Sequence, residues 1–450
     1  MRLIVQERLR LEGIDPGDPA QAALVEGLRQ RFTYENPVYW DARRFRRPCR
    51  HLARTVDLFE AAGPGEVLLP RGARDLVARL LGPDAPPPED RTVAPPADLP
   101  GFIGDLRDYQ EAAFAAAVAA RDGVIQAPTG SGKTVIACAL AARLRVRTLI
   151  VVHTSVLLDQ TAERVRTFLG IDPGKVGGGQ DEWRDVTVAM VQTLQRRDLQ
   201  ALRDAFGLVV LDECHHCPAE TFKSVVQRFA ARWRIGLSAT PTRKDRLHPV
   251  LFDVVGPICH AVKPKTLVAA GSIAPSEVVE VSTAFKGAFR NNYGRLVNRL
   301  VKDPGRNALI VGAVKDHRGE RSLVLSDRVD HCRFLAAALS AEGLPVAAMT
   351  GDLPKEARDE VLARFRRGEV TVLVATTSLV GEGFDLPAID TVFLTTPNGN
   401  VARTTQALGR ALRPAEGKTA GRIVDFVDQQ VPLLRNQARK RARVYRGFER

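Results

Sequence analysis

A glycine-rich stretch in the first third of the chain decides the fold: Ala127-Pro128-Thr129-Gly130-Ser131-Gly132-Lys133-Thr134. It follows the strand-like residues 123–126 and precedes residues 135–144, whose apolar spacing is that of a helix. Glycines let the backbone turn tightly and point its N–H groups at phosphate oxygens, and the helix adds its positive N-terminal end. The stretch therefore predicts a phosphate-binding loop in an α/β lobe, with Ala127 where the usual pattern has its first glycine.

Each part of this loop has a predicted task on a bound nucleotide. Residues 129–132 are expected to surround the phosphates with backbone N–H groups. Lys133 is expected to reach the β- and γ-phosphates, and Thr134 to hold Mg²⁺. The sequence therefore predicts ATP and Mg²⁺ as cofactors.

A pair of carboxylates follows a buried strand further along the chain. The apolar run 208–211 leads directly into Asp212 and Glu213, at the strand end where parallel sheets bind their ligands. Asp212 is predicted to bind Mg²⁺ through water, and Glu213 to orient or deprotonate the attacking water. His215 completes the predicted catalytic set of this lobe and is expected to link the ATP site to neighbouring elements.

Cysteines are few and scattered along the chain. Six cysteines in 450 residues form no disulfide framework, which fits a reducing cytoplasm. The run Cys214-His215-His216-Cys217 invites a zinc interpretation. Four consecutive residues cannot close a tetrahedral shell, and no second ligand pair lies nearby in the sequence, so we predict no zinc site.

Proline clusters and apolar runs divide the chain, whose length favours about three domains. Residues 86–100 are rich in proline and are predicted to form a stiff, extended linker. Residues 1–85 before it are expected to form a small α+β domain. Apolar runs separated by stretches of helical period then predict two lobes with doubly wound parallel sheets, at 101–262 and 263–450.

The charge balance points to a polyanionic partner. The formal net charge is +13, which favours a nucleic acid. No apolar run approaches the ~18 residues that a membrane span needs, and the N-terminus becomes polar too soon for a signal peptide. We therefore expect a cytoplasmic protein that binds no membrane.

The phosphate loop and the Asp212–His215 box together resemble the superfamily 2 helicases and translocases. This resemblance implies two RecA-like lobes and an ATPase that acts on a nucleic acid. Other motifs of the family appear in order in the first lobe: Leu106–Gln110, Val152–Gln160, Val191–Leu194 and Ser238–Pro241. By resemblance, Gln110 recognises adenine, whereas Thr154 and Gln192 contact the nucleic acid backbone.

The second lobe carries its share of the family's motifs: Leu323–Asp327, Ala375–Asp385 and Gln406–Pro414. The resemblance places Gly383 and Asp385 near the nucleotide and makes Arg410 and Arg413 the arginine-finger pair. The two arginines are three residues apart and so lie on one face of a helix. An arginine at the γ-phosphate accelerates hydrolysis by roughly 10³ to 10⁵.

The residues after Pro241 indicate a branch of the family. Thr242-Arg243-Lys244-Asp245 resembles the Arg-Glu-Asp signature of the XPB branch, with Lys244 in place of the acid and Arg243 as a predicted nucleic acid contact. The compact layout is similar to the phage helicase UvsW. The resemblance implies an XPB/UvsW-like DNA helicase of bacterial or phage type, with 3′-to-5′ movement, in repair or recombination, with a nuclease or repair protein as partner.

Two basic segments lie outside these motifs. Four arginines follow Tyr39 and Trp40 in the leading domain: Arg43, Arg44, Arg46 and Arg47. Aromatic residues beside arginines can stack on bases and hold phosphates, and the leading domain of the family binds duplex DNA. The alternative is a solvated face with both aromatic residues in the core. The tail, residues 435–450, either lies on a nucleic acid backbone or is a solvated end.

Three other functions stay open at this point. One is an RNA helicase, since no residue unambiguously reads a 2′-hydroxyl. Another is a duplex DNA translocase that remodels without separating strands. A non-enzymatic binding module of the same fold is disfavoured by the intact ATP-site residues. The sequence favours a monomer without fixing the oligomeric state.

Overall fold

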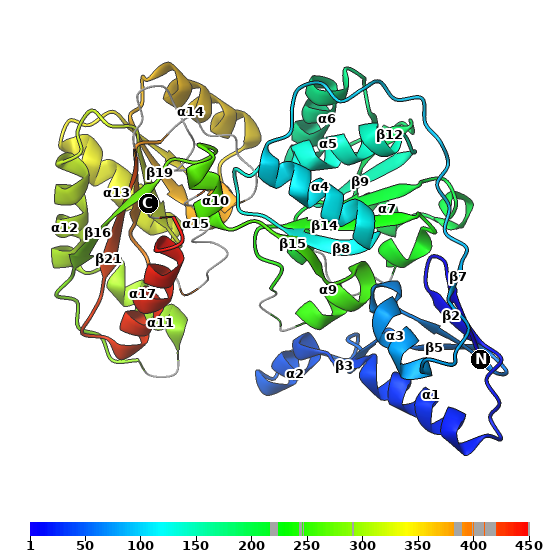
Figure 1. Ribbon diagram of the computed structural model, residues 1–450. Helices are drawn as coiled ribbons and strands as arrows, with labels where there is room; N and C mark the ends of the chain where they lie inside the picture. Colours follow the sequence, from blue (N-terminus) through cyan, green and yellow to red (C-terminus); the bar gives the residue numbers. More distant parts are fainter. Residues whose placement is uncertain are drawn as a thin grey trace. The chain divides into compact units, whose positions relative to one another are not determined.

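The computed structural model divides the chain into two compact units, seen in Figure 1. It describes residues 1–216, 224–242, 245, 247–289, 292–381, 389–397, 399, 409 and 420–448. The first unit comprises Met1–Ala127 and Gly132–Val262, and the second comprises Pro128–Ser131 and Lys263–Arg450. None of the helices in this described part of the chain is both long enough and apolar enough to cross a membrane.

The first unit begins with a small α+β domain. Its main sheet has the strand order β5-β6-β2-β1-β7, and β3 pairs with β4 in a separate hairpin. The strands are β1 (Arg2–Val5), β2 (Leu9–Glu12), β3 (Thr33–Glu35), β4 (Thr55–Asp57), β5 (Glu60–Gly63), β6 (Glu66–Leu69) and β7 (Glu89–Asp90). The helices are α1 (Pro19–Arg31), α2 (Pro37–Arg44), the 3₁₀ turn η1 (Arg71–Ala73) and α3 (Arg74–Leu81).

Local sequence explains how the helices of this domain begin. Asp18 accepts hydrogen bonds from the first backbone N–H groups of α1, and Asn36 does the same for α2. A proline follows each cap at the first helical position, where its missing N–H costs nothing. Leu28 of α1 is buried in one cluster with Leu9 and Leu11, the alternate residues of β2.

The first lobe, which completes this unit, is built on an eight-stranded sheet of order β11-β10-β12-β9-β13-β14-β8-β15. All neighbouring strands are parallel except the pair β10 and β11. The strands are β8 (Asp122–Gln126), β9 (Thr148–Val152), β10 (Gly174–Gly177), β11 (Gln180–Asp181), β12 (Val186–Met190), β13 (Leu208–Leu211), β14 (Trp233–Ser238) and β15 (Ile258–Ala261). The central strands are buried along nearly their whole length, as their continuous apolar sequences predict.

Helices cover both faces of this sheet. One face carries α4, α5 and α6 side by side, and α9 packs on β8 and β14 from the other face (Figure 1). These and the shorter helices are α4 (Asp108–Ala120), α5 (Lys133–Leu144), α6 (Ser155–Leu169), α7 (Val191–Gln195), η2 (Gln200–Leu202), η3 (Cys214–His216), η4 (Val226–Arg228) and α9 (His248–Val255). The lobe is the doubly wound α/β fold that the sequence predicts.

The segment between the small domain and the first lobe is extended and hydrogen-bonded to the lobe. Val93 N donates to Ala230 O at 2.8 Å, and Arg147 N donates to Pro95 O at 2.9 Å. Ala97 is buried. The proline-rich stretch therefore lies along the lobe rather than spanning free solvent.

A buried arginine joins the small domain to the first lobe. Arg71 on η1 is fully buried and donates to the carboxylate of Asp122, the first residue of β8, with a shortest distance of 2.6 Å. It also donates to Gln6 O at 3.1 Å and Ala231 O at 2.6 Å. The next residue, Gly72, approaches the end of α9 so closely that a Cβ would lie 2.4 Å from the backbone nitrogen of Gly256. The two parts thus meet in a close-packed, polar junction.

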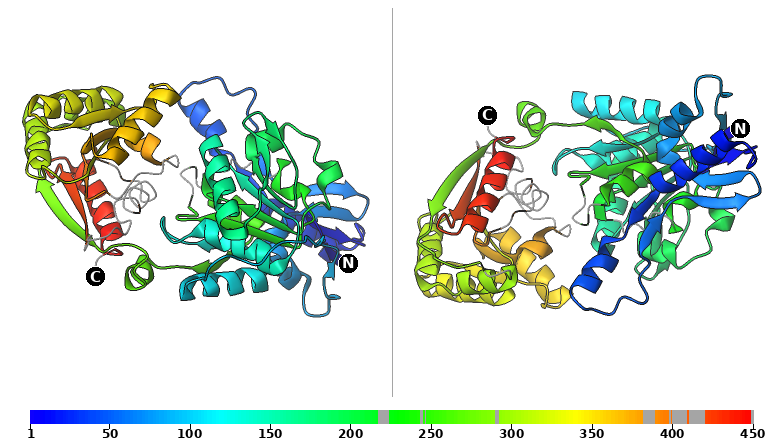
Figure 2. Two further views of the ribbon diagram at one scale, coloured as in Figure 1. Left: turned by 90° about the horizontal axis from the view of Figure 1, so that it is seen from above. Right: turned by 90° about the horizontal axis from the view of Figure 1, so that it is seen from below.

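The second unit contains a six-stranded parallel sheet of order β16-β21-β20-β17-β19-β18. Its strands are β16 (Ser276–Ser282), β17 (Ser322–Ser326), β18 (Val346–Met349), β19 (Val372–Thr376), β20 (Thr391–Leu394) and β21 (Gly421–Val427). Its helices are α10 (Pro264–Ala269), α11 (Tyr293–Leu300), α12 (Pro304–Lys315), α13 (Val329–Ala341), α14 (Lys355–Arg367), α15 (Thr377–Gly381) and α17 (Pro432–Tyr445). In Figures 1 and 2, α12 and α13 lie on one side of this sheet and α17 on the other.

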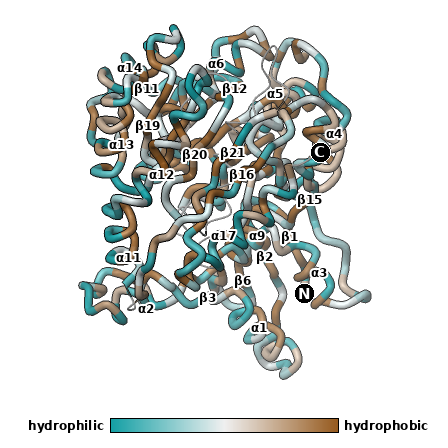
Figure 3. The backbone as a smooth tube through the Cα atoms, turned by 90° about the vertical axis from the view of Figure 1, so that its left-hand side faces the viewer, coloured by the Kyte–Doolittle hydropathy of each residue, from teal (hydrophilic) through white to brown (hydrophobic). Residues whose placement is uncertain are grey.

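The core of the second lobe follows the apolar strands. Figure 3 shows β19, β20 and β21 as largely hydrophobic segments. Val324, Val374 and Phe393 from three of its strands are buried in one cluster with Leu335 of α13. Both lobes are therefore RecA-like α/β domains, preceded by a small α+β domain.

Candidate ATP site

The phosphate loop connects β8 to α5 at the carboxyl edge of the first sheet. Gly132 is the N-cap of α5 in a left-handed conformation (φ 76°), and Gly130 also has a positive φ of 88°. Glycine adopts such angles without the strain that a Cβ would bring. Because Gly132 has no side chain to cap the helix, the first N–H groups of α5 are suited to an anionic ligand.

Gln110, the predicted adenine reader, lies against this loop. A Cβ on Gly132 would approach Gln110 Nε2 to 2.5 Å, so the side chain occupies the space that glycine leaves. Gln110 is buried, and its Oε1 accepts a hydrogen bond from Arg107 N at 3.0 Å. The start of α4 therefore brings a buried amide beside the loop.

Lys133 is held between the loop and the carboxylate pair. Its Nζ lies 3.2 Å from Glu213 Oε1 and 3.4 Å from Ala127 O. The side chain is largely buried, with 9% of its surface exposed. The structure thus brings together the lysine and glutamate that the sequence places 80 residues apart.

Asp212 is a buried carboxylate whose charge is poorly compensated. Burial, and then the neighbouring Glu213, raise the pKa of Asp212 to about 6, although Lys133 acts in the opposite direction. Its Oδ1 accepts a hydrogen bond from Glu213 N at 3.0 Å. The buried carboxylate of Asp212 and the hydroxyl of Thr134, on the first turn of α5, are oxygen donors of the kind that Mg²⁺ prefers, so these residue types fit the ion.

The carboxylate pair is connected to the next strand of the sheet. His215 Nδ1 lies 2.9 Å from Ser238 Oγ and 3.4 Å from Glu213 Oε2. Ser238 Oγ also accepts from Thr240 N at 3.1 Å, and Ser238 O accepts from Ala127 N at 2.9 Å. The Ser-Ala-Thr motif is therefore hydrogen-bonded to the DExH box on one side and to the base of the phosphate loop on the other.

Backbone strain accompanies this arrangement. Glu213 has a φ of 46°, an angle that non-glycine residues rarely adopt. Such conformations cluster at functional sites, where the surrounding structure holds them in place. The strained residue is the predicted base of the reaction.

The two predicted nucleic acid contacts of this lobe lie at the same edge of the sheet. Thr154 follows β9 and Gln192 follows β12, and these strands pair in parallel with Val152 opposite Met190. Thr154 Oγ1 accepts from Leu157 N and so caps α6, and Gln192 Nε2 donates to His153 O at 2.9 Å. Both side chains thus have structural partners within the lobe, in addition to their predicted role.

Five predicted site residues lie outside the described part of the chain: Arg243, Gly383, Asp385, Arg410 and Arg413. Their assignments remain predictions from the sequence.

The arginines of the leading domain form an exposed surface at the end of α2, which we call the α2 patch (Trp40, Arg43, Arg44, Phe45, Arg46 and Arg47). Arg43 lies over the ring of Trp40, and both Arg44 and Arg47 lie over that of Phe45, at 5.6–5.9 Å. Trp40 is 43% exposed, whereas Tyr39 is buried, so the alternative that placed both aromatic residues in the core is wrong for Trp40.

The basic C-terminal segment contains the helix α17, and not all of the arginines on this helix are exposed. Arg441 of α17 is buried and bonds the carboxylate of Asp425 at 2.8 and 2.9 Å. Tyr445 donates to the same carboxylate at 2.8 Å. Arg441 therefore anchors α17 to β21, which corrects the expectation that it belongs to a solvated end or a nucleic acid groove.

Sequence reasoning missed the buried polar residues that support the site. Arg234 of β14 is fully buried and donates to the carbonyls of Glu7, Phe229 and Val254. Nothing in the local sequence separates it or Arg71 from surface arginines, because their partners lie far away along the chain. An arginine among apolar strand residues, as in Trp233–Ser238, is the one available signal.

Two family models match the chain in the order of its two lobes. Residues 103–243 match the family described as type III restriction enzyme, res subunit. Residues 305–415 match the helicase conserved C-terminal domain. Together with the loop and carboxylate geometry, they define an ATP-hydrolysing helicase of superfamily 2.

Individual relatives identify the family within superfamily 2. The chain is 30% identical over 404 residues to the DNA 3′-5′ helicase XPB of Kineococcus radiotolerans, covering 81% of this chain and 71% of that protein. It is 29% identical over 377 residues to the DNA 3′-5′ translocase XPB2 of Sulfurisphaera tokodaii, covering 75% of this chain and 84% of the relative. The chain therefore belongs to the XPB-like family of superfamily 2 helicases.

A solved structure agrees with the fold. The fragment described as an HsdR subunit of a type I restriction enzyme from Vibrio vulnificus superposes with a TM-score of 0.58 at 23% identity. The match covers 75% of this chain and 66% of that one. At this identity the likeness supports the fold alone.

Proposed function

We propose that this protein is a DNA-dependent ATPase that couples ATP hydrolysis to 3′-to-5′ movement on DNA or to its unwinding, in DNA repair or recombination. The observation that carries the proposal is the largely buried Lys133–Glu213 pair beside Asp212, with His215 bonded to Ser238. The names of the XPB relatives support the choice of DNA and of polarity.

The ATP site suggests a division of labour between its residues. Mg²⁺, held by Thr134 and Asp212, would neutralise charge on the β- and γ-phosphates of ATP. Lys133, now paired with Glu213, would turn to the γ-phosphate, which leaves Glu213 free to orient a water and accept its proton. Gln110 would read the adenine through its amide. Arg410 and Arg413 of the second lobe would stabilise the charge that develops on the γ-phosphate.

A hydrogen-bond chain offers a route from hydrolysis to the strand-binding edge. A change at Glu213 can reach Ser238 through His215, and Ser238 holds both Thr240 and the base of the phosphate loop. Thr154 and Gln192, at the same carboxyl edge, and Arg243 after the Ser-Ala-Thr motif would meet the nucleic acid backbone. Movement would follow when these contacts tighten and relax with the nucleotide state.

We also propose that the α2 patch holds duplex DNA. Its arginines are exposed, and Trp40 and Phe45 present rings that can stack or pack on a groove. Replacing Arg43, Arg44, Arg46 and Arg47 by glutamine should weaken duplex binding and reduce the slope of log K against log salt by about 0.9 for each phosphate that is no longer neutralised. Basal ATPase should change little.

Fluorescence anisotropy with a labelled duplex at several salt concentrations measures that effect. Matched controls are Arg29→Gln and Arg79→Gln, two exposed arginines on α1 and α3 of the same domain. If the controls and the four-arginine variant show equal affinity and equal salt slope, the α2 patch does not bind DNA.

Strand displacement tests the proposed activity and its polarity. The substrates are a duplex with a 3′ single-stranded tail, the same duplex with a 5′ tail, a fork, and an RNA duplex with a 3′ tail. We expect ATP-dependent displacement on the fork and the 3′-tailed DNA. Displacement of RNA alone would favour an RNA helicase, and ATP-driven movement without displacement would favour a duplex translocase.

A further inference from the structure

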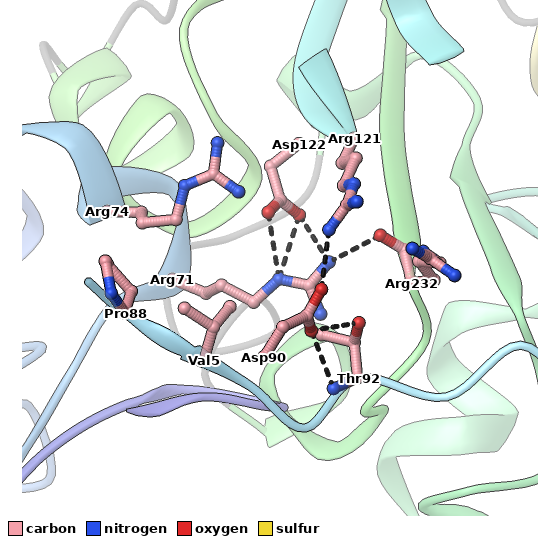
Figure 4. A pocket seen from close by; sticks show the side chains of 9 residues that line it. All are labelled: Val5, Arg71, Arg74, Pro88, Asp90, Thr92, Arg121, Asp122 and Arg232. Carbon is pink, nitrogen blue, oxygen red and sulfur yellow. Dashed lines mark hydrogen bonds and ion pairs between the residues drawn. The ribbon is translucent and has the colours of Figure 1, made fainter. Parts of the chain in front are cut away.

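A cavity of about 220 Å³ lies at the junction between the small domain and the first lobe (Figure 4). The small domain contributes Arg71 and Arg74, and the lobe contributes Arg121, Asp122 and Arg232. The cavity lies at the start of β8, whereas the phosphate loop follows the end of that strand. Five strand residues at about 3.3 Å each separate the two places by roughly 16 Å, so the cavity is distinct from the ATP site.

Positive charge dominates the lining of this cavity. Four arginines and two aspartates give a formal sum of 4 − 2 = +2. Both carboxylates already form ion pairs within the lining. Asp122 is bonded to Arg71, and Asp90 is bonded to Arg121 at 2.5 Å. Asp90 also accepts from Thr92 N and Oγ1. The carboxylates that line the cavity therefore leave the other two arginines, Arg74 and Arg232, without a counter-charge from the lining.

The interactions that Arg74 and Arg232 make with other residues are weak. Among the described residues, Arg74 bonds only the adjacent Asp75 at 3.2 Å, and that carboxylate is 73% exposed. The Nε of Arg232 is buried and has no hydrogen-bond partner in the described part of the chain, and its guanidinium lies over the Trp233 ring at 5.5 Å. An unpaired buried donor destabilises the protein, and a ligand that accepts its hydrogen bond removes this cost.

The excess charge extends behind the cavity. Arg234 is fully buried, and its pKa is lowered to about 9, first by burial and then by Arg71. Asp122 and Glu7 act in the opposite direction, each by less than Arg71 does. An anion bound beside Arg71 would relieve this repulsion.

We propose that this cavity binds a phosphate group, held by Arg74 of the small domain, by Arg232 of the first lobe and by the nitrogens of Arg121 that do not bond Asp90. Guanidinium forks match the oxygens of phosphate and bind them with charge-assisted hydrogen bonds. The volume also leaves room for several waters at about 30 Å³ each. A phosphate group here bridges the two parts of the first unit. It belongs either to a free phosphate compound or to a nucleic acid backbone.

Titration with inorganic pyrophosphate tests the proposal, with ionic strength held constant by sodium chloride. All proteins carry Lys133→Ala so that the phosphate loop contributes little. In this background we compare Arg74→Gln and the double variant Arg74→Gln/Arg121→Gln with Arg79→Gln. Arg79→Gln removes the same charge from the exposed face of the same helix.

We expect a saturable rise in melting temperature in the control, and binding weakened roughly tenfold for each arginine removed, since a charge-assisted hydrogen bond contributes about that factor. Equal pyrophosphate affinity in all three variants, or no saturable binding in any, overturns the proposal. The single variant keeps the test valid if the double variant is unstable, because the bond of Arg74 to its exposed neighbour contributes little to stability.

A second arm identifies the source of the phosphate. The same variants are titrated with a short DNA duplex in the absence of pyrophosphate. A parallel loss of duplex affinity assigns the cavity to the nucleic acid backbone. Loss of pyrophosphate binding with unchanged duplex affinity assigns it to a free phosphate compound.

Discussion

At the scale of single residues, the ATP site depends on the interactions between three largely buried charged groups. Lys133 compensates Glu213 directly, and Asp212 is left with a pKa raised to about 6. A site with excess negative charge favours the binding of a cation. A lysine whose carboxylate partner can be replaced can bind a phosphate instead. The residue types were predictable from the sequence, but the pairing and the pKa required the fold.

Lys133→Ala should reduce ATP hydrolysis to background while leaving DNA binding intact. The side chain is the positive group beside the carboxylate pair, and its removal takes away the predicted contact with the β- and γ-phosphates. Phosphate release measures turnover, and anisotropy measures binding. Lys315→Ala, which removes an exposed lysine of α12 that pairs with Glu342 at the surface, is the control and should hydrolyse ATP normally. Normal turnover in Lys133→Ala would refute the site assignment.

The pKa of Asp212 predicts how stability depends on pH without nucleotide and Mg²⁺. The unfolded carboxyl has a pKa near 3.9, so the folded state binds more protons between about pH 4 and 6. The contribution of Asp212 to stability is therefore fully present below about pH 4 and is lost as pH rises through about 6. We expect the stability of the wild type relative to Asp212→Asn to fall by up to about 3 kcal/mol across this window.

Denaturant unfolding of both proteins at a series of pH values measures this difference, in which titrating groups that do not interact with Asp212 cancel. A difference that stays constant from pH 4 to 7 would contradict the raised pKa.

At the scale of elements, parallel strands bring the motifs together. The strands β8, β13 and β14 are adjacent, and their carboxyl ends carry the phosphate loop, the DExH box and the Ser-Ala-Thr motif. The strands before the phosphate loop and the DExH box followed from the sequence, because short apolar runs directly before polar motifs predict buried parallel strands. The sheet of the leading domain did not, since its four-residue strands leave little periodicity to read.

Ser238→Ala should weaken the connection between the DExH box and the Ser-Ala-Thr motif without changing the fold of β14. The substitution removes the partner of His215 and the acceptor of Thr240 N. At roughly 1 kcal/mol for each lost hydrogen bond, we expect the stimulation of ATPase by DNA to fall about five- to thirtyfold, with a smaller effect on basal turnover. Ser340→Ala, an exposed serine on α13, controls for the hydroxyl itself. An equal loss of basal and stimulated turnover would indicate a purely structural role for Ser238.

At the scale of the whole molecule, the leading domain and the first lobe form one compact unit. Arg71 reaches into the lobe to Asp122 at the start of the strand that leads to the phosphate loop, and Arg31 bonds Asp253 on α9. The sequence predicted a small domain at 1–85 and a linker at 86–100. It did not predict the junction with the first lobe, because long-range pairing of buried charges leaves no local pattern. DNA held by the leading domain would therefore be held by the ATP-binding lobe itself.

Arg71→Met should destabilise this unit by about 3–5 kcal/mol, because it leaves the charge of Asp122 buried and unpaired. Adding Asp122→Leu should recover part of the loss. Arg2→Gln, which breaks an exposed pair with Glu12, should cost less than about 1 kcal/mol. Denaturant unfolding gives all three values. A loss for Arg71→Met as small as for Arg2→Gln would show that the junction does not stabilise the fold.

The central claim, that this chain is an ATPase driven by DNA, is tested most directly by steady-state ATP hydrolysis at one salt concentration. Turnover is compared without nucleic acid and with single-stranded DNA, duplex DNA, forked DNA and RNA, with Lys133→Ala as the blank. We predict stimulation by DNA, strongest with duplex or fork, and none in the blank. Stimulation by RNA alone, or by none of these nucleic acids, would contradict the account.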